Sequence, residues 1–379
     1  MICMLMIFPL LVIGVQCPFA LTAGATAPVA DSVALWLKAG TGITADSNGK
    51  VSAWADQSGN GISLTQATYA KQPVLVPRAI NGESVIRFNQ NYLASSALST
   101  AIDGNYTMLF VLKLSGTNYN ANYDTFFSAS EATTDDSIKG GTFALQNRSS
   151  NGYIQMATRG SLNGNTSNFP IAARASALAG YVTLAVKHSG NTLTVYMNGT
   201  QAYTITAATD VPNVKNIVRY CLGANSQTST YYGDHDLAEL IIYSKVLTDI
   251  ERQQTELYFT EKYFTPKNTL EIIQQPQIQY KDSLGATVGG LQTGGSITVT
   301  SKVISYYTAT KNATLIIALY DSQNRMVSCT YHDQALNRDV EKTYTCNITE
   351  LPSISGHYVK VFLWDSLNGM VPITNSNQL

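Results

Sequence analysis

Charged side chains are scarce in this sequence of 379 residues. Asp, Glu, Lys and Arg make up only 13% of it, against roughly 25% in an average soluble protein. The formal net charge is -1, so the chain has no long-range field to attract a polyanion or an anionic membrane. We therefore expect no nucleic-acid partner. The polar surface has to come from hydroxyl and amide side chains, which suit hydrogen bonding to neutral sugars.

Long apolar runs are also missing, apart from one near the N-terminus. Residues 4–13 are apolar but too few to span a bilayer, and Ala23-Gly24-Ala25 follows as a small-x-small cleavage pattern. Residues 1–25 are therefore predicted to be a secretory signal peptide, although no Lys or Arg precedes the apolar run. A retained N-terminal anchor is the alternative. We expect a secreted, extracellular or cell-surface protein with no membrane span once the signal is removed.

Cysteine is rare as well. Only three of the five cysteines lie beyond the predicted signal. Cys329 and Cys346 flank a loop in the C-terminal part and are the candidates for a disulfide in an oxidising compartment. Cys221 lies in an apolar segment and is predicted to be a buried, unreactive thiol. None of the three has the spacing of a zinc site.

Short alternating segments separated by Gly, Asn, Ser and Asp fill residues 31–243. This pattern is typical of an antiparallel β-sandwich rather than of βαβ units. The clearest part is a meander over 181–206, in which Val182, Leu184 and Val186 share one face. Further strands are predicted at 84–88, 107–114, 142–146, 153–158 and 237–243.

One helix is predicted after these strands. Thr248-Asp-Ile-Glu251 has the form of a capping box, in which the Thr and Glu side chains satisfy free backbone donors reciprocally. The helix is expected to end at about Phe264 and to pack Ile250, Leu257 and Tyr258 against the sandwich.

A linker is predicted at 265–269, and the alternation then resumes. A unit of about 100 residues with roughly seven short strands is typical of an immunoglobulin-like or fibronectin-like β-sandwich. Its strands are predicted at 270–280, 296–305, 314–320, 325–330, 341–348 and 358–364.

Several motifs together resemble one family. They are Ala34-Leu-Trp-Leu-Lys-Ala39, the segment 49–61 around Trp54, Val85-Ile-Arg-Phe88, Tyr196-Met-Asn-Gly199 and the closing strand 236–243 with the helix after it. These segments resemble the concanavalin A-like, laminin G-like jelly rolls of bacterial secreted proteins, over residues 28–264. The resemblance implies glycan binding, adhesion and occasional enzymes, but a fold does not fix a function. It also implies that Trp36 and Trp54 are framework residues in the core. The C-terminal unit resembles small accessory β-domains of bacterial cell-surface and carbohydrate-active proteins, through Ile317-Ala-Leu-Tyr-Asp-Ser322 and Val361-Phe-Leu-Trp-Asp-Ser366. This second resemblance implies that Trp364 is a framework residue of the core as well.

Catalytic residues are not evident from the sequence. A glycosidase needs two carboxylates on one face of a strand, and the only cluster is Asp234-His235-Asp236 with Glu239. Strict alternation places Asp234 and Asp236 on one face and Glu239 on the other. We predict no catalytic residue and keep Asp234, His235 and Asp236 as the fallback. If the protein is an enzyme, a polysaccharide lyase or a glycoside hydrolase is expected.

Calcium is the one cofactor that the resemblance implies, in a structural role. Oxygen donors suit this cation, and Asp56, Asn60, Asp234 and Asp236 lie in the loops where the family holds it.

Tyrosine-bearing polar loops are the candidate ligand site. Sugar rings stack on aromatic faces while their hydroxyls need polar partners, and an aromatic residue in a polar loop has no core to fill. The predicted ligand-binding residues are Tyr119, Tyr123, Tyr231, Tyr232, Asn118, Asn225 and Gln227. The alternative is that these tyrosines merely cover the bases of their loops.

Two all-β domains and one function follow from these predictions. The domains are a laminin G-like jelly roll at 26–266 and an immunoglobulin-like accessory domain at 267–379, and the predicted signal peptide at 1–25 precedes them. The predicted function is non-catalytic carbohydrate binding or adhesion, with a polysaccharide or cell-surface glycan as partner. A lyase or hydrolase, and a structural cell-surface or matrix protein that binds other surface proteins, remain as alternatives.

Overall fold

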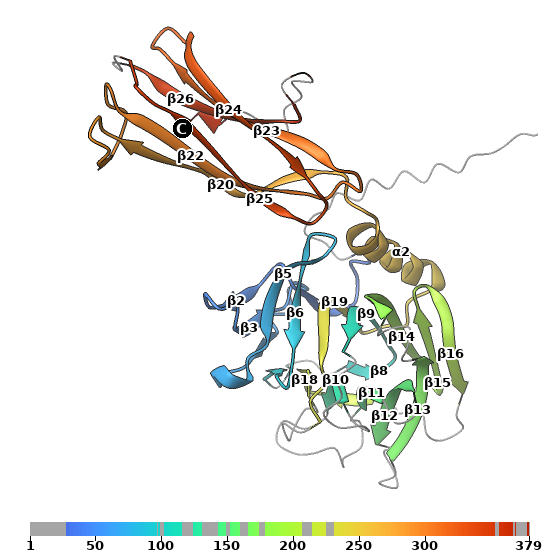
Figure 1. Cartoon of the computed structure of the whole chain (residues 1–379). Coiled ribbons are helices and arrows are strands. Elements are labelled where there is room, and N and C mark those ends of the chain that lie inside the picture. The colour runs from blue at the N-terminus through green and yellow to red at the C-terminus, as the bar shows by residue number, and fades with distance from the viewer. Residues whose placement is uncertain are drawn as a thin grey trace, which may run out of the picture.

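The described part of the chain forms two β-sandwiches joined by a short linker (Figure 1). The structure, a computed structural model, describes residues 28–378 except 97, 99–101, 116–123, 131–142, 149–151, 160–165, 174–178, 207–213, 225–230, 353–355, 367 and 369–376. The predicted all-β fold, with a jelly-roll sandwich, a helix after it and a further β domain, is confirmed. Within the described residues, no helix is both long and apolar enough to cross a membrane.

The N-terminal sandwich consists of two large antiparallel sheets. Sheet A contains, in spatial order, β16 (Thr200–Thr206), β15 (Thr192–Met197), β14 (Val182–Ser189), β9 (Tyr106–Leu114), β19 (His235–Tyr243), β6 (Glu83–Phe88) and β5 (Val74–Ile80), with β1 (Val33–Lys38) also paired to β19. Sheet B contains β13 (Thr166–Ala173), β12 (Tyr153–Arg159), β11 (Phe143–Arg148), β10 (Asp124–Ser130), β18 (Arg219–Leu222), β7 (Leu93–Ser95), β4 (Ser63–Thr65), β3 (Val51–Ala55) and β2 (Ile43–Ala45). The remaining elements here are a pair formed by β8 (Ile102–Gly104) and β17 (Val214–Ile217) and the 3-10 helix η1 (Tyr69–Lys71).

The main core lies between the two sheets. Val182, Leu184 and Val186 of β14 point into it, as their alternation predicts, and belong to the same buried cluster as Trp54 and other apolar side chains of sheet B. The outer face of sheet A, which points away from sheet B, is also largely buried, and the central strand β19 is buried at every residue. Apolar residues on both faces of a strand are expected where both faces are covered.

Helix α2 (Asp249–Phe259) and the π-helical turn η2 (Thr260–Phe264) cover part of this outer face (Figure 1). The predicted capping box is present, because the Thr248 hydroxyl accepts from the Glu251 amide and the Glu251 carboxylate accepts from the Thr248 amide. The predicted packing side is partly wrong. Ile250 and Leu257 are 69% and 53% exposed, and only Tyr258 of the three is partly buried against the sheet.

A buried carboxylate explains this orientation of the helix. Glu239 of β19 is fully buried and accepts hydrogen bonds from the hydroxyls of Tyr258 and Tyr263, 3.0 and 2.6 Å away. The Lys262 ammonium and the Trp36 indole also donate to it, at 2.7 and 2.6 Å. Because a buried charge needs several donors, the side of the helix that carries them turns toward the sheet.

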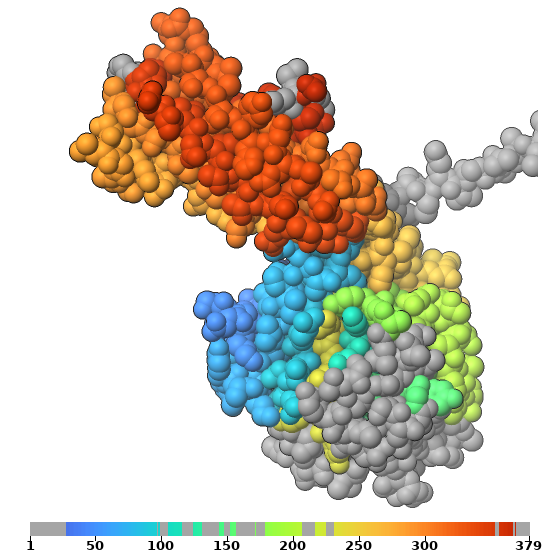
Figure 2. Space-filling model, viewed as in Figure 1, coloured from blue at the N-terminus to red at the C-terminus, as the bar shows by residue number. Residues whose placement is uncertain are grey.

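The turn between β5 and β6 contacts the linker and the second sandwich. The Asn81 amide donates to the carbonyl oxygens of Lys262 and Thr265, at 2.9 and 2.8 Å, and its oxygen accepts from the Lys267 amide at 3.1 Å. Arg78 forms an ion pair with Glu341 of the second sandwich. The two sandwiches therefore meet directly at this turn, as the space-filling view shows (Figure 2).

The C-terminal sandwich has its own core between two four-stranded sheets. One sheet contains β21 (Thr287–Val288), β20 (Leu270–Lys281), β22 (Ser296–Ser305) and β25 (Glu341–Ile348), and the other contains β24 (Met326–Leu336), β23 (Lys311–Tyr320), β26 (Tyr358–Trp364) and β27 (Asn377–Gln378). The prediction that Trp364 is a core residue is wrong. Val359, Val361 and Leu363 of β26 face the core, so Trp364 points outward and lies half-buried beside Phe362.

All three described cysteines are free thiols. Cys329 and Cys346 lie on β24 and β25, in different sheets of the C-terminal sandwich, and the disulfide between them is absent. Cys329 is exposed whereas Cys346 is buried in the core, so the two side chains point to opposite faces. Cys221 is buried as predicted, and burial raises the pKa of its thiol to about 12.

Candidate functional site

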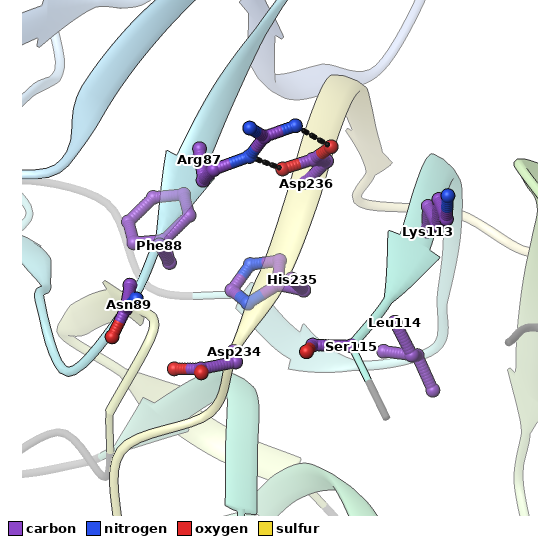
Figure 3. A pocket seen from close by; sticks show the side chains of 9 residues that line it. All are labelled: Arg87, Phe88, Asn89, Lys113, Leu114, Ser115, Asp234, His235 and Asp236. Carbon is purple, nitrogen blue, oxygen red and sulfur yellow. Dashed lines mark hydrogen bonds and ion pairs between the residues drawn. The ribbon is translucent and has the colours of Figure 1, made fainter. Parts of the chain in front are cut away.

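Polar side chains gather where three central strands of sheet A begin or end. Strands β6 and β9 end here and β19 begins here, and because neighbouring strands are antiparallel these ends meet at one edge. Figure 3 shows the resulting hollow, which has a volume of about 220 Å³. We call it the strand-end hollow. Its lining residues are Arg87, Phe88, Asn89, Lys113, Leu114, Ser115, Asp234, His235 and Asp236.

Asp236 is held by two neighbours on the outer face of sheet A. Arg87 donates from Nε to Oδ1 at 2.7 Å and from Nη2 to Oδ2 at 2.8 Å, which is the bidentate geometry that guanidinium favours (Figure 3). The Tyr181 hydroxyl donates to Oδ2 at 2.8 Å. The Asp236 carboxylate also raises the pKa of Arg87. Asp236 is therefore a neutralised, hydrogen-bonded carboxylate.

His235 lies at the centre of the hollow in Figure 3. Its ring is 2% exposed and stacks in parallel on Phe88, with 4.5 Å between the ring centres. Nδ1 lies 3.1 Å from the Gly233 carbonyl oxygen, whereas Nε2 has no hydrogen-bond partner. Burial lowers the pKa of His235 to about 4. The imidazole is thus neutral at pH 7, with a lone pair on Nε2 when Nδ1 donates to Gly233.

Asp234 forms the lower wall of the hollow in the same view. Its Oδ1 accepts from the Gln90 amide at 3.1 Å, and its backbone carbonyl accepts from the Ser115 amide at 3.0 Å. The hollow thus offers the Asp234 carboxylate, the amide of Asn89 and the cation of Lys113, whereas Nε2 of His235 is buried beneath its surface. Such a mixture suits hydrogen bonding to a polyhydroxylated ligand.

The prediction for Glu239 is wrong. The β19 register shifts between Leu237 and Glu239, which is the mark of a β-bulge. The extra residue, Ala238, places Glu239 on the same outer face as Asp236. The two carboxylates nevertheless do not form a pair of catalytic acids, because Glu239 is covered by α2 and η2.

Most of the predicted ligand-binding residues lie outside the described part of the chain, namely Tyr119, Tyr123, Asn118, Asn225 and Gln227. Tyr231 is described and is 38% exposed. Tyr232 is half-buried, with its ring 6.3 Å from that of Tyr92 and the Lys71 ammonium 4.4 Å above it. Tyr232 thus packs on the outer side of sheet B, beside Cys221 and Ala224.

The four candidate calcium ligands do not converge on one ion. Asp56 accepts from the Trp36 amide, and the Asn60 side chain donates to the carbonyl oxygens of Val33 and Ala34. These contacts lie at the start of β1, which pairs with the far end of β19. Asp234 and Asp236 lie at the near end of the same strand. In the described residues, no group of three or more acidic, histidine or cysteine side chains is placed to hold a metal.

Arg87 and Lys113 belong to the hollow and were missed by the sequence analysis. Lys113 is the one charged residue of β9, and Arg87 shares β6 with Glu83 alone, so alternation predicts only that each points outward. Their meeting with Asp236 depends on the pairing of β19 between β9 and β6, across about 120 to 150 residues of chain. No local pattern encodes that pairing.

Comparison with known proteins supports the fold. Residues 88–251 match the family model described as the concanavalin A-like lectin/glucanases superfamily. That match begins at Phe88 and so does not include the motifs around Trp36 and Trp54. No curated protein matches the chain.

Among solved structures, the botulinum neurotoxin serotype D binding domain is 14% identical, covers 89% of this chain and 86% of its own, and has a TM-score of 0.43. The binding domain of botulinum neurotoxin DC in complex with SialylT is 11% identical, with 88% and 85% covered and a TM-score of 0.43. The binding domain of Paraclostridial Mosquitocidal Protein 1 is 13% identical, with 75% and 65% covered and a TM-score of 0.44.

Proposed function

Because residues 88–251 match the concanavalin A-like lectin/glucanases superfamily, we propose that this protein is a carbohydrate-binding or adhesive module that retains a glycan without cutting it. The state of Asp236 carries the proposal. Its carboxylate is occupied by Arg87 and Tyr181, and the neighbouring His235 is neutral and buried. Neither group is thus placed as the exposed acid or base that hydrolysis of a glycosidic bond needs, because Asp236 is already bonded and Nε2 of His235 is buried. The hollow still offers groups that can hydrogen-bond a sugar.

The ligand class is a neutral glycan. The two cations of the hollow, Arg87 and Lys113, are balanced by Asp234 and Asp236, so no net charge favours an acidic or a basic ligand. We extend the contact surface to the loop tyrosines Tyr231 and Tyr232, because Tyr232 precedes the Gly233-Asp234 turn that leads into the hollow.

Export is part of the proposal, because the apolar run at 4–13 is followed by a small-x-small cleavage pattern at 23–25. The signal at 1–25 is tested by N-terminal sequencing of the protein recovered from a secreting host, where we expect the chain to begin near residue 26. Recovery of residues 1–25 on a membrane-bound protein would instead favour the retained anchor.

The experiment that tests the function is a panel of neutral and acidic polysaccharides with the full mature chain, with and without Ca²⁺. Both retention and the release of shortened or unsaturated products are scored. We expect retention of a neutral glycan without products. Release of products would favour a lyase or hydrolase. If no glycan is retained, a structural surface protein becomes the favoured interpretation. Dependence of retention on Ca²⁺ would support the predicted calcium site.

Variants locate the binding surface. Asn89→Ala and Lys113→Ala each remove a side chain that lines the hollow, and we expect each to weaken retention about tenfold, or about 1.4 kcal/mol. Tyr231→Ala tests the loop in the same way. Gln277→Ala, on an exposed position of β20 in the other sandwich, is the matched control and should change nothing. If all four variants retain the glycan as well as the parent protein does, the glycan binds outside the strand-end hollow and its loop.

A further inference from the structure

A second hollow lies beside the C-terminal end of α2, on the outer face of sheet A. It has a volume of about 320 Å³ and lies between the helix, strand β14 and the turn from β15 to β16. We call it the helix hollow. The residues used below are Tyr181, Thr183, Asn198, Glu256, Leu257 and Phe264, all of which line it.

Apolar side chains form one wall of the helix hollow. Leu257 and Phe264 lie seven residues apart and are 53% and 36% exposed. The ring of Tyr181, on β14's side, lines the same space and is only half-buried. Exposed apolar side chains gathered around a concave space are typical of a binding site.

Polar groups accompany these apolar ones. The Asn198 oxygen accepts from the Thr183 amide at 3.0 Å, which leaves the amide nitrogen of Asn198 as a donor on an exposed turn. Glu256 is buried, and its Oε2 pairs with Arg252 while its Oε1 has no hydrogen-bond partner. A ligand with an apolar face and hydroxyl groups would match this combination, and a pyranose ring has both.

A row of side chains joins the two hollows. Asp236 pairs with Lys113 on one side and with Arg87 on the other. Val182 pairs with Leu112, so Tyr181 lies beside Lys113 in the next position, and the Lys113 ammonium is 5.9 Å from the Tyr181 ring centre. Tyr181 lines the helix hollow with its ring and bonds Asp236 of the strand-end hollow with its hydroxyl. The row crosses β14, β9, β19 and β6, three strand spacings or about 14 Å.

We propose that the two hollows are subsites of one extended surface, and that the ligand is a linear neutral glycan chain lying across the strands of sheet A. This inference rests on the glycan-binding function proposed above. Once one part of a glycan chain occupies the first subsite, the rest of it is held near the second subsite at a high effective concentration, which raises the overall affinity. A single sugar ring gains no such advantage, because about 14 Å separates the ends of the row.

Chain length is the variable that tests this inference. The neutral polysaccharide retained most strongly in the panel is cut to oligosaccharides of two to six residues, and their affinities are measured by calorimetry. We expect the affinity of the full chain to rise at least tenfold between the shortest and longest oligosaccharides. In Leu257→Ala and Phe264→Ala this rise should largely disappear, while the shortest oligosaccharides, held in the strand-end hollow, bind as before.

Ile250→Ala is the control, since Ile250 is exposed on the same helix but does not line the helix hollow. Leu257 is mostly exposed, so its variant should fold even if Phe264→Ala does not. The proposal of an extended surface would be overturned if affinity did not depend on oligosaccharide length. It would also be overturned if both variants kept the same dependence on length as the parent protein. Either result would leave the proposed glycan binding intact. Failure of every glycan to bind would overturn the function and this inference together.

Discussion

Glu239 shows how a single residue determines the packing of a helix. Four donors from β1, α2 and η2 converge on its carboxylate, which is fully buried in the outer face of sheet A. Burial and the nearby carboxylate raise the pKa of Tyr263 well above its ordinary value, so its hydroxyl stays protonated and donates. A buried charge with satisfied donors fixes one arrangement of its surroundings.

Removal of the Glu239 charge should therefore lower the stability of the N-terminal sandwich. We expect Glu239→Gln to lower the free energy of unfolding of the N-terminal sandwich by roughly 2 to 4 kcal/mol, because Lys262 loses its counter-charge and a tyrosine hydroxyl meets an amide donor. Urea denaturation measures the change. Glu261→Gln, on an exposed position of η2, is the control and should cost almost nothing. A loss below about 0.5 kcal/mol in Glu239→Gln would show that the network contributes little.

His235 makes stability depend on pH. Its pKa is about 4 in the folded protein against an ordinary value of 6.5, because burial disfavours the imidazolium. As the pH falls from about 6.5 to 4, the unfolded chain takes up a proton that the folded chain does not, so stability falls. The full effect is on the order of 3 kcal/mol.

His235→Asn should reduce this dependence, because the asparagine amide can still donate to Gly233 but does not titrate. Urea midpoints at pH 7, 6, 5 and 4.5 give the slope for each protein. We expect a lower stability at pH 7 from the lost stacking on Phe88 and a shallower fall toward pH 4.5. His332→Asn, in the other sandwich, should leave the slope of the N-terminal sandwich unchanged. Parallel slopes for His235→Asn and the parent protein would contradict the prediction.

At the scale of elements, the start of α2 depends on one hydroxyl. Thr248→Ala removes the acceptor for the Glu251 amide, and loss of such a cap costs about 1 kcal/mol. We expect this loss in the unfolding free energy of the N-terminal sandwich. Gln253→Ala, on the exposed side of the helix, should be neutral or slightly stabilising because alanine favours helix. Equal stabilities of the two variants would mean that packing alone positions the helix.

Helices, strands and turns whose formation depends on residues close together in the sequence were predictable. The meander of β14, β15 and β16, the capping box and six strands of the second sandwich follow from alternation and turn residues.

The candidate site was less predictable from the sequence. Asp234, His235 and Asp236 were named together because they are adjacent, but their partner Arg87 reaches them only through strand pairing. The β-bulge at Ala238 has no local sequence signal, and the face assigned to Glu239 was wrong for that reason.

At the scale of the whole molecule, the turn between β5 and β6 is the feature that relates the two sandwiches (Figures 1 and 2). Gly82 in this turn has a φ of 81°, and a Cβ atom there would lie 2.8 Å from Cζ of Tyr306 in the second sandwich. Only glycine allows both the positive φ and this close approach.

Gly82→Ala should therefore loosen the contact between the sandwiches without unfolding either. Small-angle scattering should report a broader distribution of distances in the variant, and each sandwich should keep its own unfolding transition. Gly190→Ala is a matched control, because Gly190 also has a positive φ but its added Cβ would meet open space. A scattering curve for Gly82→Ala that equals that of Gly190→Ala would contradict the assigned role of the turn.

The hydrogen bonds of Asn81 also matter when the molecule is under tension. A pulling force applied between the two sandwiches passes along the backbone at 265–267 and, in parallel, through the side chain that bonds Thr265 and Lys267. The linker cannot extend until those bonds and the Arg78–Glu341 ion pair break. A two-sandwich protein joined in this way transmits a pulling force to its second sandwich without first extending the linker.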